Sequence, residues 1–275
     1  MSMSIRTNVS SLNAQRNLYQ TQSQLDSSLS KLSSGFRITK AGDDAAGLGI
    51  SVNLEAQIRS YNQGARNAND GMSVVQTAES SLNEQSNILS RLRELAMQSA
   101  SDGIGDTERG YIQSEVTQQT SEIDRIANAT EFNGKKLLDG TGGTLDFQVG
   151  IRNVAANDRI SVATVDATAT TLGVNALDLS TKANAQGALA TIDTALETLS
   201  TARATLGAAG NRFSSTVASI QASAESLSAA NSRIRDVDVA EETSRMARSQ
   251  VLMQAGVSVL SQANQSPQLA LKLLG

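Results

Sequence analysis

Apolar residues recur at alternating three- and four-residue intervals along both ends of this chain, with polar residues between them. The longest such series lies in the C-terminal half and comprises Leu189, Ile192, Leu196, Leu199, Leu206, Phe213, Val217, Ile220, Ala224, Leu227 and Ile234. This spacing places the apolar residues along one narrow side of a helix. The pattern therefore predicts one long helix that begins near Ala183 and packs lengthwise against other helices.

The N-terminal half predicts three further helices. Apolar positions from Ile5 to Phe36 share one face with a single-residue slip, which gives a helix of about nine turns ending near Gly35. The polar stretch 40–44 is a hinge in which Asp43 or Asp44 can cap a second helix, from about Ala45 to Ala100. A third helix starts near Asp106, and the short loop before it favours an antiparallel helical hairpin.

The period of the pattern changes to two after the third helix. Leu145, Phe147 and Val149 alternate with polar residues, and the stretch 159–165 does the same. We therefore expect a β-hairpin at about 144–165 with a long loop. Residues 166–182 are rich in Thr, Ala and Asn, and we expect them to be irregular.

The last segment carries a seven-residue apolar repeat, which is coiled-coil spacing. Its main positions are Val239, Met246, Met253, Leu260, Pro267 and Leu274, and Val257 and Leu271 add a second position. We expect Pro267 to kink or weaken this helix locally. Both terminal segments have few apolar side chains with which to offset the entropy of ordering. We therefore expect both termini to be largely disordered in the free monomer, and helical when paired with each other and with neighbouring subunits.

Composition narrows the class of protein. The chain has 275 residues, no Cys, no His, no Trp and a formal net charge of -4. The absence of Cys excludes disulfides and thiolate metal sites, and the absence of His removes the commonest general base and transition-metal ligand. The charge favours neither nucleic acid nor a membrane surface as a partner. No segment reads as a membrane-spanning helix, and residues 1–15 lack the features of a secretory signal peptide.

Several motifs, taken together and in order, resemble the bacterial flagellins. The hinge has Leu-Ser-Ser-Gly-Phe-Arg-Ile at 32–38 and Asp-Asp-Ala-Ala-Gly at 43–47, and the second helix carries Arg-Asn-Ala-Asn-Asp-Gly at 66–71. Glu-Ile-Asp-Arg at 122–125 precedes Phe-Asn-Gly at 132–134, and the C-terminus has Gln-Ala-Gly-Val-Ser-Val-Leu at 254–260 and Gln-Ala-Asn-Gln at 262–265. The resemblance covers roughly residues 1–150 and 183–275.

The resemblance implies a mainly α fold and a structural, non-enzymatic subunit of the helical filament that a rotary motor turns for swimming. Residues 1–42 and 237–275 would form the inner tube, and residues 43–236 a helical shell domain. The outer domains common in the family would be absent, because only residues 150–182 are available for them. Export without a cleaved signal peptide would place the protein outside the cell, with no cofactor. Implied partners are copies of itself, the flagellar cap and hook-associated proteins, and an export chaperone at the C-terminal helix.

Two sets of candidate residues follow from this resemblance. The subunit interface is expected to use apolar residues of both terminal helices: Ile5, Val9, Leu12, Leu25, Leu29, Val257, Leu260, Leu271 and Leu274. Arg91, Leu95 and Glu115 match positions through which a host Toll-like receptor recognises some flagellins, and an ordinary filament contact is the alternative role for them. Ser90 departs from the Gln common in receptor-activating members. For residues 66–71, the alternatives are a polar patch at a helix contact and a hydrogen-bonded subunit junction.

Other functions are left open as alternatives. A hook–filament junction protein is the nearest, and a secreted helical effector or adhesin is another. An enzyme on a helical scaffold is a further alternative, but the chain has no phosphate-binding loop, no dinucleotide turn and no nucleophile elbow. Asp43, Asp44, Asp236 and Asp238 are better explained as helix caps and hinge charges than as catalytic or metal-binding carboxylates.

Overall fold

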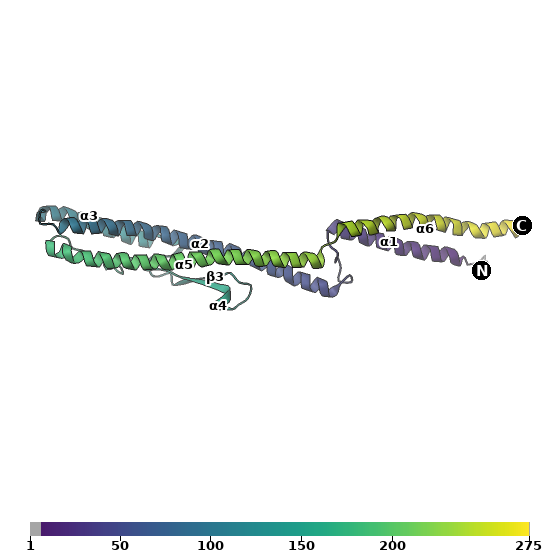
Figure 1. Cartoon of the computed structure of the whole chain (residues 1–275), viewed down its shortest axis with the longest axis horizontal. Coiled ribbons are helices and arrows are strands. Elements are labelled where there is room, and N and C mark those ends of the chain that lie inside the picture. Colours follow the sequence, from purple (N-terminus) through teal and green to yellow (C-terminus); the bar gives the residue numbers. More distant parts are fainter. Residues whose placement is uncertain (1–6, 275) are drawn as a thin grey trace. The chain divides into compact units, whose positions relative to one another are not determined.

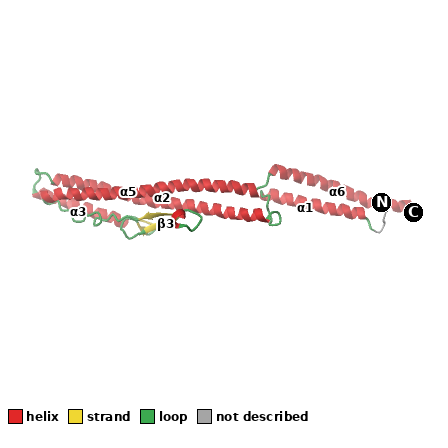
Figure 2. Cartoon of the chain, turned by 60° about the horizontal axis from the view of Figure 1, so that its bottom comes forward, coloured by secondary structure: helices red, strands yellow, loops and turns green. Residues whose placement is uncertain are grey.

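The computed structural model describes the backbone of residues 7–274 and the side chains of residues 7–265 (Figure 1). Its long helices are α1 (Val9–Ser34), α2 (Ala45–Ser99), α3 (Asp106–Ala129), α5 (Lys182–Arg235) and α6 (Val239–Leu274). The short elements are β1 (Glu131–Phe132), β2 (Lys135–Lys136), β3 (Thr144–Gln148), α4 (Ala155–Asp158) and β4 (Arg159–Ala163). The prediction of a mainly α fold with long packed helices and a small antiparallel hairpin is confirmed (Figure 2).

The chain divides into two compact units. The first unit comprises residues 1–56 and 226–275, and the second comprises residues 57–225. The helices α2 and α5 therefore contribute residues to both units.

In the first unit, α1 and α6 pack side by side as an antiparallel pair. The Asn8 side-chain amide donates to the Ala263 carbonyl at 2.8 Å, and Leu18 lies over Gly256, where an added Cβ would be 3.0 Å from Leu18 Cδ1. The covered side of α6 follows a strict heptad spacing and consists of Glu242, Met246, Ser249, Met253, Gly256, Leu260 and Ala263. Of the predicted main heptad positions, Met246, Met253 and Leu260 lie on this side, whereas Val239 is 60% exposed and the side chains of Pro267 and Leu274 lie outside the described residues. The second position on this side is occupied by small or polar residues. Val257 is 54% exposed and lies off this side.

Polar side chains fix the ends of these helices. Asn8 caps α1 by accepting from the Ser11 backbone N–H at 3.0 Å, and Gly35 ends α1 in the left-handed conformation with φ 75°. At the hinge, Asp44 caps α2 by accepting from the Gly47 N–H at 2.8 Å. Asp43 instead accepts from the backbone N–H groups of Thr39 and Lys40, and these bonds lower the pKa of its carboxyl. Asp238 caps α6.

In the second unit, α2 and α5 run antiparallel and enclose one apolar core with α3 and the β3–β4 hairpin. Phe213 of α5 is fully buried, and its ring occupies the space over Gly71 of α2, where a Cβ would lie 2.5 Å from Phe213 Cζ. Phe147 of β3 meets the Phe213 ring edge-on at 5.4 Å between centroids. Because Gly71 of α2 has no side chain, Phe213 of α5 has room to contact Phe147 of the hairpin.

The segment between β4 and α5 lacks regular structure, as expected, but it belongs to the core. Ala167, Ala169, Leu172, Val174 and Leu179 are buried. Side chains of α2 and α3 supply the hydrogen bonds that its backbone needs. Gln113 both donates to the Leu177 carbonyl and accepts from the Leu179 N–H, at 2.9 and 2.6 Å, and the buried Gln85 donates to the Ala167 carbonyl.

Two features differ from the sequence-based expectations. Asn133 and Gly134 do more than break the helical pattern, because both have positive φ (48° and 75°) and connect β1 to β2 in a tight hairpin. The loop of the larger hairpin contains the short helix α4. The α6 backbone is helical through Pro267 to Leu274, and the expected kink or weakening at Pro267 stays a prediction.

Candidate assembly surfaces

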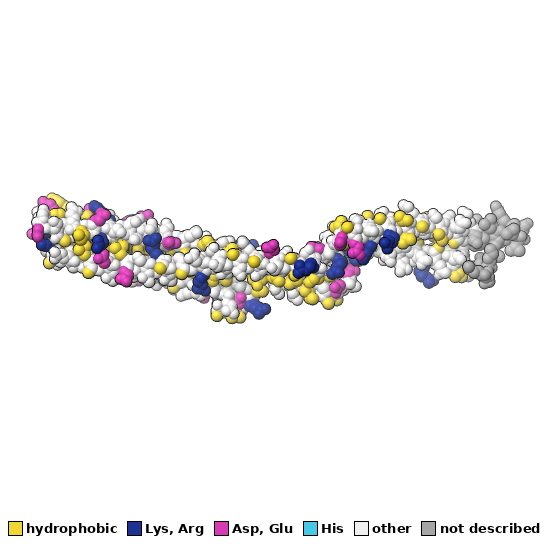
Figure 3. Space-filling model, viewed as in Figure 1, with side chains coloured by type: hydrophobic (Ala, Val, Ile, Leu, Met, Phe, Trp, Pro, Cys, Tyr) yellow, Lys and Arg dark blue, Asp and Glu magenta, His cyan; other side chains and the backbone are white. Residues whose placement is uncertain are grey.

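The first unit exposes apolar side chains that its own helices do not cover. On α1, Val9, Leu12 and Tyr19 are 59%, 51% and 78% exposed. On α6 the exposed large apolar residues lie on more than one side of the helix and are Val239, Val251, Leu252, Val257 and Val259. A helix that is apolar on several sides is typical of a buried position. The described part of the chain leaves these side chains uncovered, and Figure 3 shows hydrophobic side chains at the surface of the α1–α6 pair.

The predicted interface residues fall into three groups in the structure. Val9, Leu12, Leu29 and Val257 are exposed and available to a neighbouring molecule. Leu25 is buried between α1 and α6, and Leu260 is half-buried on the same seam, so both contribute to the packing within the chain. Ile5 lies outside the described residues, as do the side chains of Leu271 and Leu274.

The two chain segments that connect the terminal helices to α2 and α5 are joined to each other. Phe36 and Asp236 form an antiparallel bridge, in which the Val237 N–H donates to the Gly35 carbonyl at 3.0 Å. The Arg235 guanidinium lies 4.1 Å from the centre of the Phe36 ring and also pairs with Glu55 at 3.1 Å. Sequence reasoning missed this junction, because Phe36 and Arg235 are almost two hundred residues apart.

Arg91, Leu95 and Glu115 lie close together in the second unit but differ in exposure. Arg91 of α2 donates to Glu115 of α3 at 3.0 Å and pairs with Glu94 at 3.0 Å. The hydrogen bond to Glu115, and then that to Glu94, raises the pKa of the Arg91 guanidinium. Leu95 is only 2% exposed and belongs to the apolar core. The accessible part of this site is therefore the Arg91–Glu115 pair.

The motif at residues 66–71 has an inward and an outward side. Asn67, Ala68 and Gly71 face the chain's own elements, and the Asn67 side-chain amide donates to the Gln148 carbonyl at the end of β3, at 2.8 Å. Arg66, Asn69 and Asp70 are exposed. The inward side fits a polar patch at a helix contact, and the outward side remains open to a neighbouring molecule.

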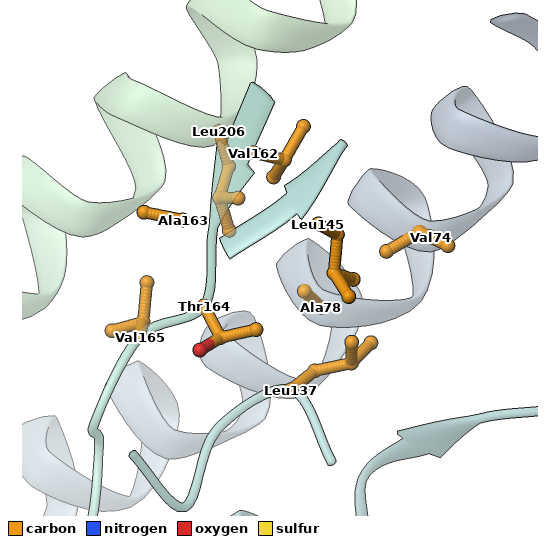
Figure 4. Close-up of a pocket in the computed structure, with 9 residues that line it drawn as sticks. All are labelled: Val74, Ala78, Leu137, Leu145, Val162, Ala163, Thr164, Val165 and Leu206. Carbon is orange, nitrogen blue, oxygen red and sulfur yellow. The ribbon is translucent and has the colours of Figure 1, made fainter. Parts of the chain in front are cut away.

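Among the described residues, no group of three or more acidic side chains is arranged to hold a metal ion, and no helix is long and apolar enough to span a bilayer. The cavity beneath the hairpin has a volume of about 10 Å³ and is lined almost entirely by apolar side chains, including Val74, Leu145 and Leu206 (Figure 4). A space of that size holds at most one water molecule.

Long paired helices with uncovered apolar sides define a structural protein that assembles into larger polymers. Comparison with known proteins identifies the family. The model of the bacterial flagellin N-terminal helical region matches residues 5–142, and that of the flagellin C-terminal helical region matches residues 189–274. The chain belongs to the bacterial flagellin family, and it is a structural subunit of the flagellar filament.

Relatives of similar length support this assignment. A flagellin of Halalkalibacterium halodurans is 43% identical over 272 residues, which covers 99% of this chain and 100% of the relative. The flagellin of Bacillus subtilis is 42% identical over 306 residues, with the same coverage of each chain. The crystal structure of Bacillus cereus flagellin superposes with a TM-score of 0.51 at 32% identity, covering 56% of this chain and 88% of that one. These matches favour the filament subunit over a junction protein, an effector or an adhesin.

Proposed function

We propose that the α1–α6 pair forms the inner tube of the filament and that the second unit forms the surrounding shell. The observation that carries this proposal is the exposure of apolar side chains on both sides of the pair, including Val9, Leu12, Val251 and Val257. Burying such side chains against neighbouring copies stabilises the polymer by about 1.5–3 kcal/mol for each side chain fully removed from water. Repeated contacts between different patches extend a helical polymer without closing it.

A charge placed in the apolar surface of α1 tests this proposal. We expect Leu12→Asp to abolish seeded polymerisation, because a carboxylate cannot be buried unpaired between subunits. Gln24→Asp is the matched control, since Gln24 is an exposed polar position on a different side of α1 from Leu12, and it should still polymerise. Sedimentation and electron microscopy measure the polymer, and circular dichroism checks the helix content of each monomer. Normal filaments from Leu12→Asp would refute the inner-tube assignment.

We also propose that an export chaperone binds α6 before assembly and that the cap and hook-associated proteins contact the ends of the polymer. The apolar residues on several sides of α6 support a chaperone site, because an isolated helix of this kind needs cover in water. Export is expected to proceed without cleavage of residues 1–15. Mass spectrometry of protein taken from filaments tests this, and a mass lacking those residues would contradict it.

Recognition by a host Toll-like receptor is proposed for the Arg91–Glu115 pair alone. Both side chains are partly exposed, at 48% and 40%. A cell reporter assay with monomer should give a lower signal for Arg91→Ala than for the unchanged chain. Equal signals, or no signal from either protein, would rule out this role.

A further inference from the structure

The β3–β4 hairpin ends in a compact structure that projects an apolar and basic surface. This hairpin end comprises residues 150–158. Val154 is 46% exposed and Arg152 is exposed, and neither side chain has a hydrogen bond or ion pair among the described residues. In Figure 3 the hairpin stands out from the helices of the second unit and carries hydrophobic, basic and acidic side chains.

The hairpin end is rigid because several internal hydrogen bonds hold it. The buried Asp158 accepts from the Val154 N–H at 2.9 Å through its carboxylate, and its own carbonyl accepts from the Val149 and Gly150 N–H groups at 2.8 and 2.9 Å. The Gln148 amide donates to the carbonyls of Gly150 and Arg152, at 2.9 and 2.7 Å. A surface that is ordered before it binds loses less entropy on binding.

A complementary groove lies between α2 and α3 of the same unit. This acidic groove has a volume of about 470 Å³, and half-buried Ile88 and Ile126 supply its apolar part. Glu84, Glu122 and Glu131 line it together with a single cation, Arg125. Glu122 pairs with Arg125 at 2.6 Å and Glu131 with Lys136 at 2.8 Å, whereas Glu84 has no ion pair within the described part of the chain.

The hairpin end cannot reach the groove of its own chain. Leu145, at the start of β3, lies with Val74 and Ala78, and Val149, past its end, lies on Gly64. The hairpin therefore extends along α2 toward lower residue numbers, away from the groove. Thr77, at the near edge of the groove, is 13 residues from Gly64, which is roughly 20 Å along the helix at ~1.5 Å per residue.

We propose that the hairpin end of one subunit docks into the acidic groove of the next subunit, with Val154 against Ile88 and Ile126 and Arg152 against Glu84. The two surfaces differ and lie apart on each chain, so the contact is head-to-tail and repeats without closing. The opposite charges fix which surfaces meet, and the apolar residues at the centre supply the affinity. This proposal rests on the filament assembly assigned above and adds a specific contact to it.

A charge swap tests the ionic part of the contact. Arg152→Glu and Glu84→Arg should each slow seeded elongation by about tenfold or more, because either change places two like charges against each other in the contact. The double variant Arg152→Glu/Glu84→Arg should recover most of that rate. The matched control is Arg152→Glu/Glu197→Arg, which has the same net charge but reverses an exposed carboxylate on α5, outside the groove. It should remain as slow as Arg152→Glu alone. A swap that recovers no better than this control would overturn the proposal.

Disulfide crosslinking tests the geometry, and the absence of native Cys makes the result easy to interpret. Val154→Cys combined with Ile88→Cys, the groove residue that Val154 is proposed to contact, should give a ladder of covalent oligomers when reduced filaments are oxidised. Val154→Cys combined with Thr205→Cys, on α5, should give none. Filaments that form normally but yield no ladder from the first pair would overturn the docking contact while leaving the filament assignment intact.

Discussion

The two units of the chain bury their apolar side chains to very different extents. Among the side chains that the structure describes, Leu25 and Ile38 are the only buried hydrophobic residues of the first unit, and the rest of the buried set lies in the second. The exposed large hydrophobic residues show the reverse distribution, because outside the first unit only Met97, Tyr111 and Val154 remain among them. The second unit therefore holds most of the apolar packing that stabilises the subunit, and the first unit holds most of the large apolar side chains that the described chain leaves exposed.

Buried polar groups differ between the units in a related way. In the second unit they join separate elements: Ser99 donates to the Leu179 carbonyl at 2.6 Å, and the buried Arg109 donates to the Ser99 carbonyl at 2.9 Å at the end of α2. In the first unit, Ser11 and Ser51 also join separate elements by donating to Asn264 and Asn231. There, however, Ser28, Glu242 and Ser249 occupy positions on the α1–α6 seam that larger apolar residues would fill in a self-sufficient coiled coil. The seam is thus specific but weak.

The largest expected difference between the units is in amide hydrogen exchange of the monomer. Core amides of α2 and α5 within residues 57–225 should open with free energies approaching global unfolding, about 5–15 kcal/mol, whereas α1 and α6 should open at close to zero. The physical reason is the small apolar area that the terminal pair buries by itself. Exchange measured by mass spectrometry before and after polymerisation checks this, and assembly should protect both terminal helices. Strong protection of residues 7–40 and 240–265 in the free monomer would refute the comparison.

A core truncation should separate folding from assembly. Phe213→Ala removes a fully buried ring that contacts Gly71 and Phe147, and it should destabilise the second unit by about 3–5 kcal/mol. Val251→Ala, at a position 64% exposed on α6, should change the monomer's stability by less than about 0.5 kcal/mol. Urea denaturation followed by circular dichroism measures both. Equal losses from the two variants would show that the units do not differ in this way.

A smaller effect is expected at the glycine beneath Phe213. Gly71→Ala places a Cβ 2.5 Å from Phe213 Cζ, so the ring must shift, and we expect a loss of about 1–3 kcal/mol despite the better helix propensity of Ala. Gly207→Ala is the control on α5, where an added Cβ meets nothing within 4 Å, and it should stabilise the helix by up to about 1 kcal/mol. Denaturant midpoints give both values. Stabilisation by Gly71→Ala would mean that Phe213 does not need this space.

The sequence predicted the helices well because their apolar spacing is regular over many turns. It placed α2 at about Ala45–Ala100, and the helix is Ala45–Ser99. It failed where the structure depends on contacts distant in sequence. Ala167 and Ala169 show no periodic signal, yet they are buried because Gln85 and Asp124 bond their backbone. The Asn133-Gly134 turn did carry a recognisable signal, since Asn-Gly is typical of tight hairpins.

The candidate interface was harder to predict than the fold. Apolar spacing alone cannot distinguish a side chain that packs within the chain, such as Leu25, from one left for a neighbour, such as Leu12. Both residues fit the same amphipathic helix, and only the partner helix decides between them. The heptad in α6 had the same ambiguity, because Gly256 and Ser249 give no apolar signal although they lie on the seam.

The smallest expected effect concerns the ion pair between Arg93 of α2 and Asp193 of α5, at 2.6 Å in the second unit. The hydrogen bond from Arg93 lowers the pKa of the Asp193 carboxyl. A carboxyl whose pKa is lower in the folded state stabilises the fold above its unfolded pKa, about 3.9, and this contribution is lost as the pH falls through the folded pKa. Asp193→Asn should therefore lower the melting temperature slightly at pH 7, and the difference from the unchanged chain should vanish as the pH falls below about 4.

Both side chains are about half exposed, so 1 M salt should also reduce the difference. Asp70→Asn is the control, because the exposed Asp70 has no ion pair in the described chain, and it should show no such pH dependence. A melting-temperature difference for Asp193→Asn that persists at pH 2 would mean that packing, and not charge, accounts for the role of Asp193 between α2 and α5.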